Sequence, residues 1–321
     1  MEPLVSVHIA TYNQKDFIGK AIDSAISQQV SFPIEIVIGD DLSTDGTREV
    51  LLSYKEKYPE KIVLNLLLEK GKGMIGRENY ETTMDLCKGK YIAFLDGDDY
   101  WKDDGKLEEQ VKFLESNEDF VMCHHDCEAK MTEGVKLKKD FSKAHKETGF
   151  YEACQITIPF MSSVVIRRDA LNYFNRRKWL ENLDLGDFAL WAMASLKGKA
   201  YYIDKEMAYY RVNANSVTKI LGYEVQARNR IKFAEQLLDS EYKFDRGFIN
   251  RFLCRYYFQY SGIYFSKRNP VGVFKYGFKS MLSYFKGMSL KSRNYKWIKR
   301  LKWGTLFKIY LANVSKSLKF S

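Results

Sequence analysis

The first hundred residues of this 321-residue chain alternate between short apolar segments and segments with helical periodicity. The apolar segments predict strands at residues 4–10, 34–38, 62–68 and 91–95. The helical periodicity predicts helices at residues 17–26, 47–54 and 77–87. This alternation is typical of a parallel sheet covered by helices, and right-handed crossovers make such a sheet doubly wound. We therefore expect an α/β fold with a mostly parallel sheet flanked by helices.

Polar clusters follow three of these predicted strands directly, at residues 11–13, 40–41 and 96–98. Ligands of open α/β sheets bind in the crevice at the carboxyl ends of the strands. The three clusters are therefore expected to converge on one binding site. Ser43 and Thr44, after the second cluster, are also suitable for capping the next helix.

The third cluster and the residue after it contain three carboxylates, those of Asp96, Asp98 and Asp99. Carboxylates that are packed together repel one another and raise one another's pKa unless a cation neutralises them. Mg²⁺ and Mn²⁺ prefer hard oxygen ligands, and Mg²⁺ is commonly held by one or two carboxylates together with substrate phosphates. The motif predicts a divalent cation that also contacts a diphosphate. The alternative is a solvated turn that caps the following helix.

The pattern after residue 105 is less regular. It predicts helices at 107–114 and 187–197, and short strands at 120–124, 163–166, 200–203 and 207–210. Residues 126–150 are polar and are expected to form a loop or a hairpin.

The charge is divided unevenly along the chain. Residues 221–321 contain 21 Lys and Arg against 5 Asp and Glu, which leaves 30 against 36 for residues 1–220. We place a boundary near residues 219–223, which gives an α/β domain at 1–220 and a basic, aromatic-rich helical extension at 221–321.

Residues 246–321 contain 17 Lys and Arg and no acidic residue, and their aromatic residues follow helical spacing in places. Basic amphipathic helices with Trp and Phe suit an anionic membrane surface. The alternative is that these helices pack on the first domain and expose a solvated basic face. Nucleic acid is not expected, because no helix-turn-helix, zinc-finger or RNP pattern accompanies the charge.

Five cysteines at irregular spacing favour reduced thiols in a cytosol over a disulfide framework. The sequence shows no signal peptide and no run of 18 apolar residues. We expect a cytoplasmic protein, peripheral on the inner face of the plasma membrane.

The segment 123–127 (Cys-His-His-Asp-Cys) contains several side chains that can bind zinc. A five-residue cluster without a second half is weak support for a closed tetrahedral site. Packing at a strand end is favoured, with His125 or Asp126 near an acceptor. His8, in the middle of the first strand, is expected to be a core histidine with its hydrogen bonds satisfied.

Several segments together resemble family 2 glycosyltransferases with the Rossmann-like GT-A fold. They are residues 5–13, 35–47, 95–99, 185–191 and 209–216, in the family's order. The resemblance covers residues 4–218 and leaves the last hundred residues unmatched. It implies a nucleotide-sugar donor, a divalent cation and inversion at the anomeric carbon.

Carried over to this chain, the resemblance assigns roles to nine residues. Asp187 is implied as the general base and Asp98 as the direct metal ligand. The implied nucleotide-sugar contacts are Thr11, Tyr12, Asn13, Asp41 for the base, Arg77 for the base or diphosphate, Asp96 by the ribose, and Gly97.

Two positions depart from the family. Gly186 stands where a Glu often precedes the catalytic Asp, and Asn213 stands where a His often approaches the metal. Asp187 also has a simpler interpretation, as a carboxylate that the dipole of a helix N-terminus favours.

The expected activity is transfer of a sugar, UDP-linked in the donor, to a hydroxyl of a glycan or lipid-linked acceptor in bacterial capsule, O-antigen or lipopolysaccharide synthesis. The transferred group is expected to be a hexosyl or N-acetylhexosaminyl residue. Two alternatives stay open: a sugar nucleotidyltransferase, and a non-catalytic scaffold that binds a nucleotide-sugar.

Overall fold

The computed structural model describes residues 2–73, 76–131, 136–137, 146–154, 159–184, 186–212 and 217–289. Contacts within the chain divide it into two units. One consists of Met1–Glu181 and Gly186–Ser216, and the other of Asn182–Leu185 and Val217–Ser321. The division between Ser216 and Val217 lies close to the predicted boundary near residues 219–223. The short segment Asn182–Leu185 also belongs to the second unit.

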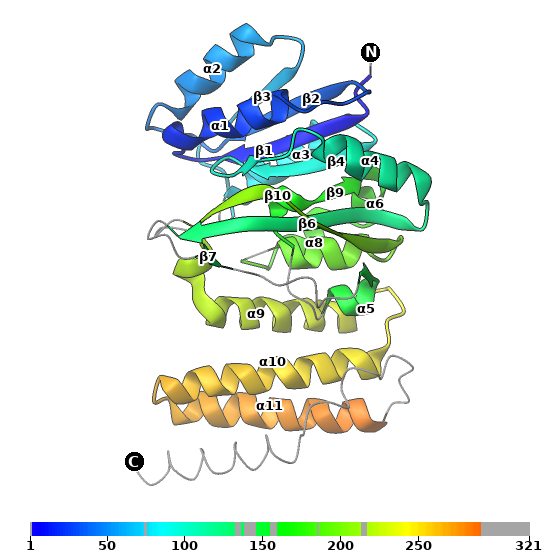
Figure 1. Cartoon of the computed structure of the whole chain (residues 1–321). Coiled ribbons are helices and arrows are strands. Elements are labelled where there is room, and N and C mark those ends of the chain that lie inside the picture. The colour runs from blue at the N-terminus through cyan, green and yellow to red at the C-terminus, as the bar shows by residue number, and fades with distance from the viewer. Residues whose placement is uncertain are drawn as a thin grey trace. The chain divides into compact units, whose positions relative to one another are not determined.

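The first unit is built on one mixed sheet (Figure 1). Its strands are β1 (Val5–Thr11), β2 (Ile34–Asp40), β3 (Ile62–Leu66), β4 (Tyr91–Asp96), β5 (Tyr100–Trp101), β6 (Phe120–Met131), β7 (Lys136–Leu137), β8 (Glu147–Thr148), β9 (Val165–Arg167) and β10 (Lys199–Val212). Their order is β3-β2-β1-β4-β9-β6-β10-β5, with β7 beside β6 and β8 beside β10. The long pairings are parallel: β1 with β2 and β4, β2 with β3, and β6 with β10. The prediction of a mostly parallel sheet is confirmed.

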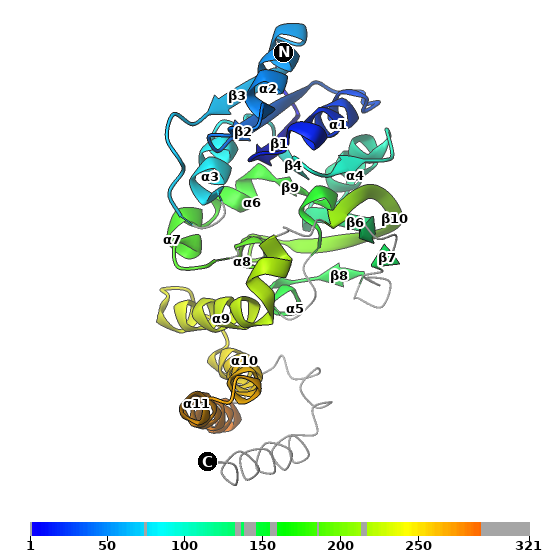
Figure 2. The ribbon, with the colours of Figure 1, turned by 90° about the vertical axis from the view of Figure 1, so that its left-hand side faces the viewer.

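Helices cover both faces of this sheet. They are α1 (Lys15–Ile26), α2 (Thr47–Lys57), α3 (Arg77–Asp85), α4 (Lys106–Ser116), α5 (Phe150–Ala153), α6 (Arg168–Asn172), α7 (Arg176–Leu180) and α8 (Asp187–Ala194), with a 3₁₀ turn, η2, at Met161–Ser163. Figure 2 shows α1 and α4 on one side of the sheet and α3 and α6 on the other.

The central strands are buried on both faces, which is why apolar residues predominate in them. In β1, Val5, Val7 and Ile9 are fully buried, and so is the intervening His8 at 1% exposure. The helix α1 places Ile18 and Ile22 against this core. The carboxyl ends of β1, β2 and β4 are thereby held in a rigid, solvent-excluded layer.

For residues 126–150 the hairpin alternative is confirmed, because β6 pairs antiparallel with β7, with Ala129 opposite Leu137 and Lys130 opposite Lys136. The predicted end of the strand at 124 is wrong, since β6 continues to Met131 and pairs with β10 along its length. The prediction for the last strands is also wrong. The two short strands predicted at 200–203 and 207–210 are one strand, β10, with register shifts between Ile203 and Ala208. The polar residues 204–206 lie at this irregularity, where a strand can bend without ending.

The second unit contains α9 (Val217–Asp239), α10 (Arg246–Ser266) and α11 (Pro270–Ser289), of which α10 and α11 lie side by side. The segment at 182–184 is fastened to α9. Arg228 forms an ion pair with Asp184 at 2.9 Å, the backbone N–H of Asp184 donates to Asn229 at 2.8 Å, and Lys232 donates to the Asn182 carbonyl at 2.8 Å. Within the described ranges, no helix has the length and apolar character needed to cross a bilayer.

Candidate active site

The register of the sheet brings the predicted polar clusters together. Thr11 is opposite Asp40 in the β1–β2 pairing, and Ala10 is opposite Asp96 in the β1–β4 pairing. The backbone N–H of Asp41 donates to the Thr11 carbonyl at 3.1 Å. The three clusters therefore lie at one edge of the sheet, as expected for parallel strands that end together.

Gly97 sits where its backbone approaches the loop after β1. A Cβ at this position would lie 2.3 Å from the Gln14 Oε1 and 3.0 Å from the Thr11 side chain. Thr11 is buried and its hydroxyl donates to the Gln14 Oε1 at 2.7 Å. Any larger residue at 97 would displace these side chains, so the loop after β4 depends on a glycine here.

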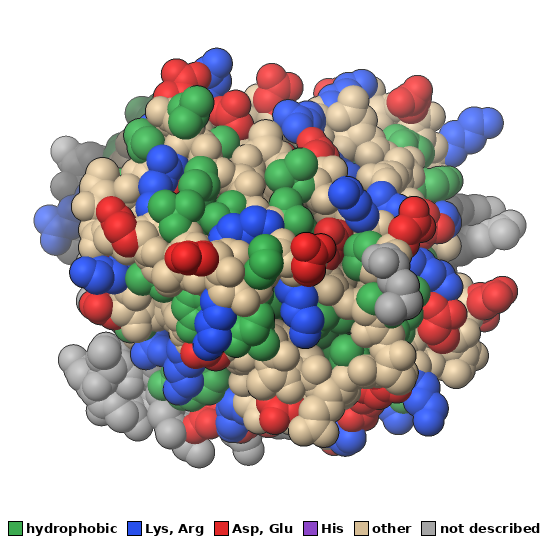
Figure 3. Space-filling model, turned by 90° about the horizontal axis from the view of Figure 1, so that it is seen from above, with side chains coloured by type: hydrophobic (Ala, Val, Ile, Leu, Met, Phe, Trp, Pro, Cys, Tyr) green, Lys and Arg blue, Asp and Glu red, His purple; other side chains and the backbone are tan. Residues whose placement is uncertain are grey.

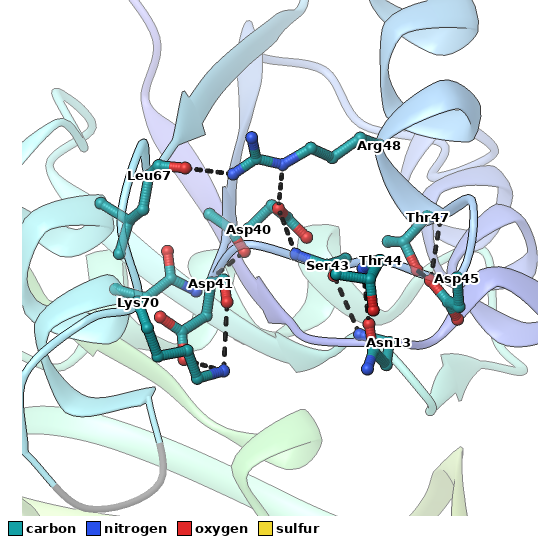
Figure 4. Close-up of polar contacts among 12 residues, drawn as sticks. Asn13, Asp40, Asp41, Ser43, Thr44, Asp45, Thr47, Arg48, Leu67 and Lys70 are labelled. Carbon is teal, nitrogen blue, oxygen red and sulfur yellow. Dashed lines mark hydrogen bonds and ion pairs between the residues drawn. The ribbon is translucent and has the colours of Figure 1, made fainter.

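Asn13 ties two loops together (Figure 4). Its Oδ1 accepts from the backbone N–H of Thr44 at 2.8 Å, and its own N–H donates to the Ser43 hydroxyl at 2.9 Å. The expected helix-capping role of Ser43 and Thr44 is wrong, because Gly46 occupies the N-cap of α2 and no side chain caps it. Asn13 is thus placed to fix the loop geometry beside Tyr12.

Asp40 has a structural environment behind the site. Its fully buried carboxylate forms an ion pair with Arg48 at 2.5 Å and accepts from the Ser43 N–H at 3.0 Å. Arg48 also donates to the Leu67 carbonyl, as Figure 4 shows. Asp40 and Arg48 therefore join the loops that follow β2 and β3.

Asp41 points instead toward Lys70 and Tyr12. The Lys70 ammonium lies 2.8 Å from the Asp41 carboxylate and 3.0 Å from the centroid of the Tyr12 ring. Asp41 also accepts from the Gly71 N–H at 2.8 Å. The Tyr12 residue is 47% exposed, with the Lys70 ammonium over one face of its ring. Lys70 was not predicted, because an isolated lysine in a polar loop belongs to no recognisable pattern.

The three carboxylates after β4 have different environments. Asp99 is buried, accepts from the Ser162 hydroxyl at 2.6 Å and accepts from the Arg211 N–H at 2.9 Å. Burial, together with the charges of Asp96 and Asp98, raises the pKa of Asp99 well above its ordinary value. Asp99 therefore holds the loop to β10 and η2 and is not available to a ligand.

Asp96 and Asp98 form the accessible part of the motif, and both are partly exposed. Burial, together with the charges of Asp98 and Asp187, raises the pKa of Asp96 to about 7. The Arg211 guanidinium donates to the Asp98 carbonyl at 3.0 Å, which fixes the backbone of the loop. Negative charge is thus concentrated on Asp96, Asp98 and Asp187.

Asp187 is the first residue of α8, and its Oδ1 accepts from the Phe188 N–H at 2.9 Å. Its charge acts on Asp96 and also on the partly buried Tyr80, whose pKa lies well above the ordinary value chiefly because of burial. The Tyr80 hydroxyl has no hydrogen-bond partner in the described part of the chain. No sequence pattern pointed to Tyr80, since its position in α3 is also that of an ordinary core aromatic residue.

Arg77 begins α3 and donates to the Leu180 carbonyl at the end of α7. Gly186 packs near the same residue, since a Cβ there would lie 3.1 Å from the Leu180 side chain. Arg77 is thereby linked to the chain segment that enters α8. Asn213, the other departure from the family pattern, lies outside the described residues.

The donor set fits the expected Mg²⁺ or Mn²⁺ with substrate as a further ligand. In the described ranges, no three His, Cys, Asp or Glu side chains are grouped to hold a metal on their own. Asp96 and Asp98 are the neighbouring carboxylates at this edge of the sheet, and the pKa of Asp96 is raised. Such a pair suits a cation that takes its remaining ligands from water and phosphate.

The histidines on the sheet are packed in the core. The His8 Nε2 lies 3.0 Å from the Tyr80 carbonyl, and burial lowers the pKa of His8 to about 4, so the expectation of a satisfied core histidine is confirmed. His125 is fully buried in β6, which removes it from any open acceptor surface. Asp126 is partly exposed and accepts from the Tyr202 hydroxyl at 2.7 Å.

A buried lysine lies behind the carboxylate loop. Lys106 is fully buried, its ammonium is 4.1 Å from the centroid of the Trp101 ring, and no described residue accepts a hydrogen bond from it. Burial lowers the pKa of Lys106 to about 7. In the unfolded chain the pKa returns to its ordinary value near 10.5.

Replacing Lys106 with Met is expected to raise the free energy of unfolding by about 2–4 kcal/mol near neutral pH, because Met removes the cost of burying an ammonium group. The gain is smaller than that full cost, since the cation–π contact with Trp101 offsets part of it. Between its two pKa values only the unfolded state holds the proton, so the native chain gains stability as pH rises through this window. The advantage of the variant should be full at and below about pH 7 and shrink toward about pH 10. Urea unfolding of the variant, with the exposed Lys112→Met on the same helix as control, measures this. An equal advantage at both pH values would contradict it.

Comparison with known proteins agrees with this architecture. Residues 6–174 match the family described as Glycosyl transferase family 2. The putative teichuronic acid biosynthesis glycosyltransferase TuaG of Bacillus subtilis is 34% identical over 220 residues, which cover 68% of this chain and 82% of TuaG. The Escherichia coli protein WfaP, a UDP-Glc:alpha-D-GlcNAc-diphosphoundecaprenol beta-1,3-glucosyltransferase, is 30% identical over 83% of this chain and 99% of its own length.

Other relatives match less of their own length, since the chain spans 37% of three uncharacterised mycobacterial proteins that are 33% identical over 132 residues. Among solved structures, S. aureus TarS 1–349 in complex with UDP-GlcNAc has a TM-score of 0.55 at 19% identity and covers 90% of this chain and 91% of that one. The mannosyltransferase PcManGT from Pyrobaculum calidifontis, in complex with GDP-Man and Mn²⁺, has a TM-score of 0.57 at 17% identity, over 99% of this chain and 88% of that one. The expected GT-A architecture is confirmed, and the chain belongs to glycosyl transferase family 2.

Proposed function

We propose that the protein is an inverting, metal-dependent glycosyltransferase of bacterial surface-polysaccharide synthesis. It moves a hexosyl or N-acetylhexosaminyl group from a UDP-sugar to a hydroxyl of a glycan or lipid-linked acceptor. The pathway is supported by TuaG and WfaP, whose names place them in teichuronic acid synthesis and in glucosyl transfer to a diphosphoundecaprenol acceptor. UDP is supported by the TarS complex with UDP-GlcNAc.

One observation carries the proposal: the charges of Asp98 and Asp187 both act on Asp96, at the edge where β1, β2 and β4 end. A nucleoside diphosphate with its cation neutralises such a cluster, which gives the donor a reason to bind here. A solvated turn after β4 would not keep the Asp187 carboxylate of α8 within reach of Asp96 and Asp98.

The nucleotide-binding roles follow the same edge of the sheet. Tyr12 offers an exposed ring for the base, and Asp41 accepts hydrogen bonds from its polar edge. Thr11, Asn13 and Gly97 shape the loop that the nucleotide contacts. Arg77 lies near the base or diphosphate, and Asp96 lies by the ribose.

In the proposed reaction, the acceptor oxygen forms a bond to the anomeric carbon as the bond from that carbon to the diphosphate oxygen breaks. The Asp187 carboxylate takes the proton of the acceptor hydroxyl, and no covalent enzyme intermediate is needed for inversion. A bound divalent cation at Asp98 supplies charge stabilisation for the diphosphate. Asp99, Ser162 and Arg211 keep the loop in place during the step.

A thermal-shift screen of nucleotide-sugars with and without Mn²⁺ tests this function. A UDP-sugar at 100 times its Kd is expected to stabilise the fold by about 2.7 kcal/mol, and more strongly with Mn²⁺ than with EDTA. Slow hydrolysis of the same donor should accompany binding. Binding without any turnover would favour the scaffold, and exchange of pyrophosphate into the nucleotide-sugar would favour the nucleotidyltransferase.

The location belongs to the same proposal. The enzyme acts in the cytoplasm, at the inner face of the plasma membrane, where residues 246–321 contact anionic lipid and a lipid-linked acceptor is presented. The face of the first unit seen in Figure 3 has acidic and basic side chains interspersed, which does not suit a nucleic-acid backbone.

A further inference from the structure

The helix α11 exposes large apolar side chains and buries small ones, which is the reverse of what is expected for a helix in water. Its large apolar side chains are exposed, by 76% at Val271, 66% at Phe274, 52% at Phe278, 42% at Leu282 and 59% at Phe285. A helix of a water-soluble protein normally turns such residues toward its neighbours. A stripe of this kind requires a covering that the described residues do not supply.

These five residues form one continuous face. They follow one another at intervals of three or four positions, which keeps them on the same side of an α-helix. At 1.5 Å per residue the stripe is about 21 Å long. We define the α11 stripe as Val271, Phe274, Phe278, Leu282 and Phe285.

The opposite side of α11 consists largely of small residues and packs closely on α10. A Cβ added to Gly272 would lie 2.0 Å from the Tyr264 ring, and one added to Gly287 would lie 2.8 Å from the Arg251 side chain. The hydroxyl of the buried Ser280 donates to the Cys254 carbonyl on α10 at 2.9 Å. Small residues between helices with large apolar residues facing outward is the arrangement that helices adopt against lipid.

The charge beside the stripe is entirely positive. Lys275, Lys279 and Lys286 each follow a phenylalanine of the stripe by one position, so they flank one of its edges, and all three are exposed. No acidic residue occurs after Asp245. Long lysine side chains can extend from the edge of an embedded helix to reach lipid headgroups.

We propose that the α11 stripe is the surface that inserts into an anionic lipid leaflet, with Lys275, Lys279 and Lys286 contacting its headgroups. The inference rests on the proposed function for its setting and specifies which face of the basic extension meets the membrane. Charge decides among the occupants. A second copy would bring two rows of lysines together, and residues 290–321 of the same chain contain nine Lys and Arg and no acidic residue. An anionic surface attracts the lysines beside the stripe, whereas a second copy and the basic residues 290–321 repel them.

Vesicle flotation of the full chain tests the proposal. Vesicles of phosphatidylcholine containing about one quarter phosphatidylglycerol should bind the protein, pure phosphatidylcholine should bind it weakly, and added salt should reduce binding. The double variant Phe274→Ser with Phe278→Ser should lose about tenfold or more of its partitioning into anionic vesicles. Leu68→Ser, which removes a 93% exposed side chain from the first unit, is the matched control and should bind as the wild type does.

A fluorescent label identifies what covers the stripe. All five native cysteines are buried and free, so Phe278→Cys introduces an accessible thiol for an environment-sensitive dye. Its emission should shift to the blue only when anionic vesicles are added. A blue-shifted emission without vesicles would show that the protein covers its own stripe. If the wild type is a dimer and the double variant Phe274→Ser with Phe278→Ser is a monomer, a second copy covers the stripe. Either result, or unchanged vesicle binding by the double variant, overturns the proposal.

The failure of this inference is separable from failure of the proposed function. Flotation uses no donor and no acceptor, so it reports lipid contact alone. The thermal shift caused by a UDP-sugar should be unchanged in the double variant, because the stripe lies in the second unit and the donor site in the first. An unchanged unfolding temperature of the variant without ligand shows that it is folded, so that lost vesicle binding counts for the proposal.

Discussion

Replacing Asp187 with Asn is expected to lower the rate of sugar transfer by about 10²- to 10⁴-fold, because the acceptor hydroxyl loses the carboxylate that takes its proton. Donor binding should change little, since the proposed nucleotide contacts come from Thr11, Tyr12 and Asp41. The Asn side chain can still accept from the Phe188 N–H, so α8 should begin at the same residue. Single-turnover transfer measures the rate, and the UDP-sugar thermal shift measures donor binding.

The control for this variant is Asp169→Asn, which changes a carboxylate with 62% exposure and an ion pair to Lys197. Transfer should be normal in this control. If the only role of Asp187 is its favourable interaction with the dipole of α8, its replacement costs about 0.3–1 kcal/mol of stability and leaves transfer intact. Near-normal turnover by Asp187→Asn would therefore assign the base to another residue.

Replacing Asp98 with Asn is expected to remove the extra stabilisation that Mn²⁺ gives in the presence of a UDP-sugar, and to lower transfer by about 10²- to 10³-fold. The reason is that a neutral amide is a poor substitute for the carboxylate that would hold the cation against the diphosphate. Thermal shifts with Mn²⁺ and with EDTA measure the effect, and EDTA should give the wild type the behaviour of the variant.

Two neighbouring carboxylates make this test specific. Asp104→Asn changes an exposed carboxylate in the same loop region, which accepts from Ser27, and should keep the full response to Mn²⁺. Asp99→Asn should weaken the fold, because Asp99 accepts from both Ser162 and Arg211, while the metal response is retained. A full Mn²⁺ response in Asp98→Asn would place the cation elsewhere.

The sequence predicted the first half of the sheet well because burial there is simple. The strands β1, β2 and β4 are buried on both faces, so apolar residues predominate in each of them. The later strands are harder to predict. The strand β10 contains Asp204, Lys205 and Glu206, which are exposed, and a polar triplet of this kind cannot be distinguished by composition from a turn.

The candidate site was predicted in outline, and the division of labour within it was not. Position in the chain identifies Asp96, Asp98 and Asp99 as one acidic group, but only packing shows that Asp99 faces Ser162 and the backbone of Arg211. Lys70 pairs with Asp41 from a loop that carries no motif. Such pairings depend on tertiary contacts between distant segments, which local spacing does not encode.

The segment at 182–184 has a practical consequence for anyone who wishes to prepare the α/β unit alone. The chain leaves that unit after Glu181 and returns to it at Gly186, immediately before Asp187. A fragment ending at residue 216 would lack Arg228, Asn229 and Lys232, which now fasten this excursion. Such a fragment could keep its sheet and its nucleotide loops and still be a poor enzyme, since the start of α8 would have lost its tether.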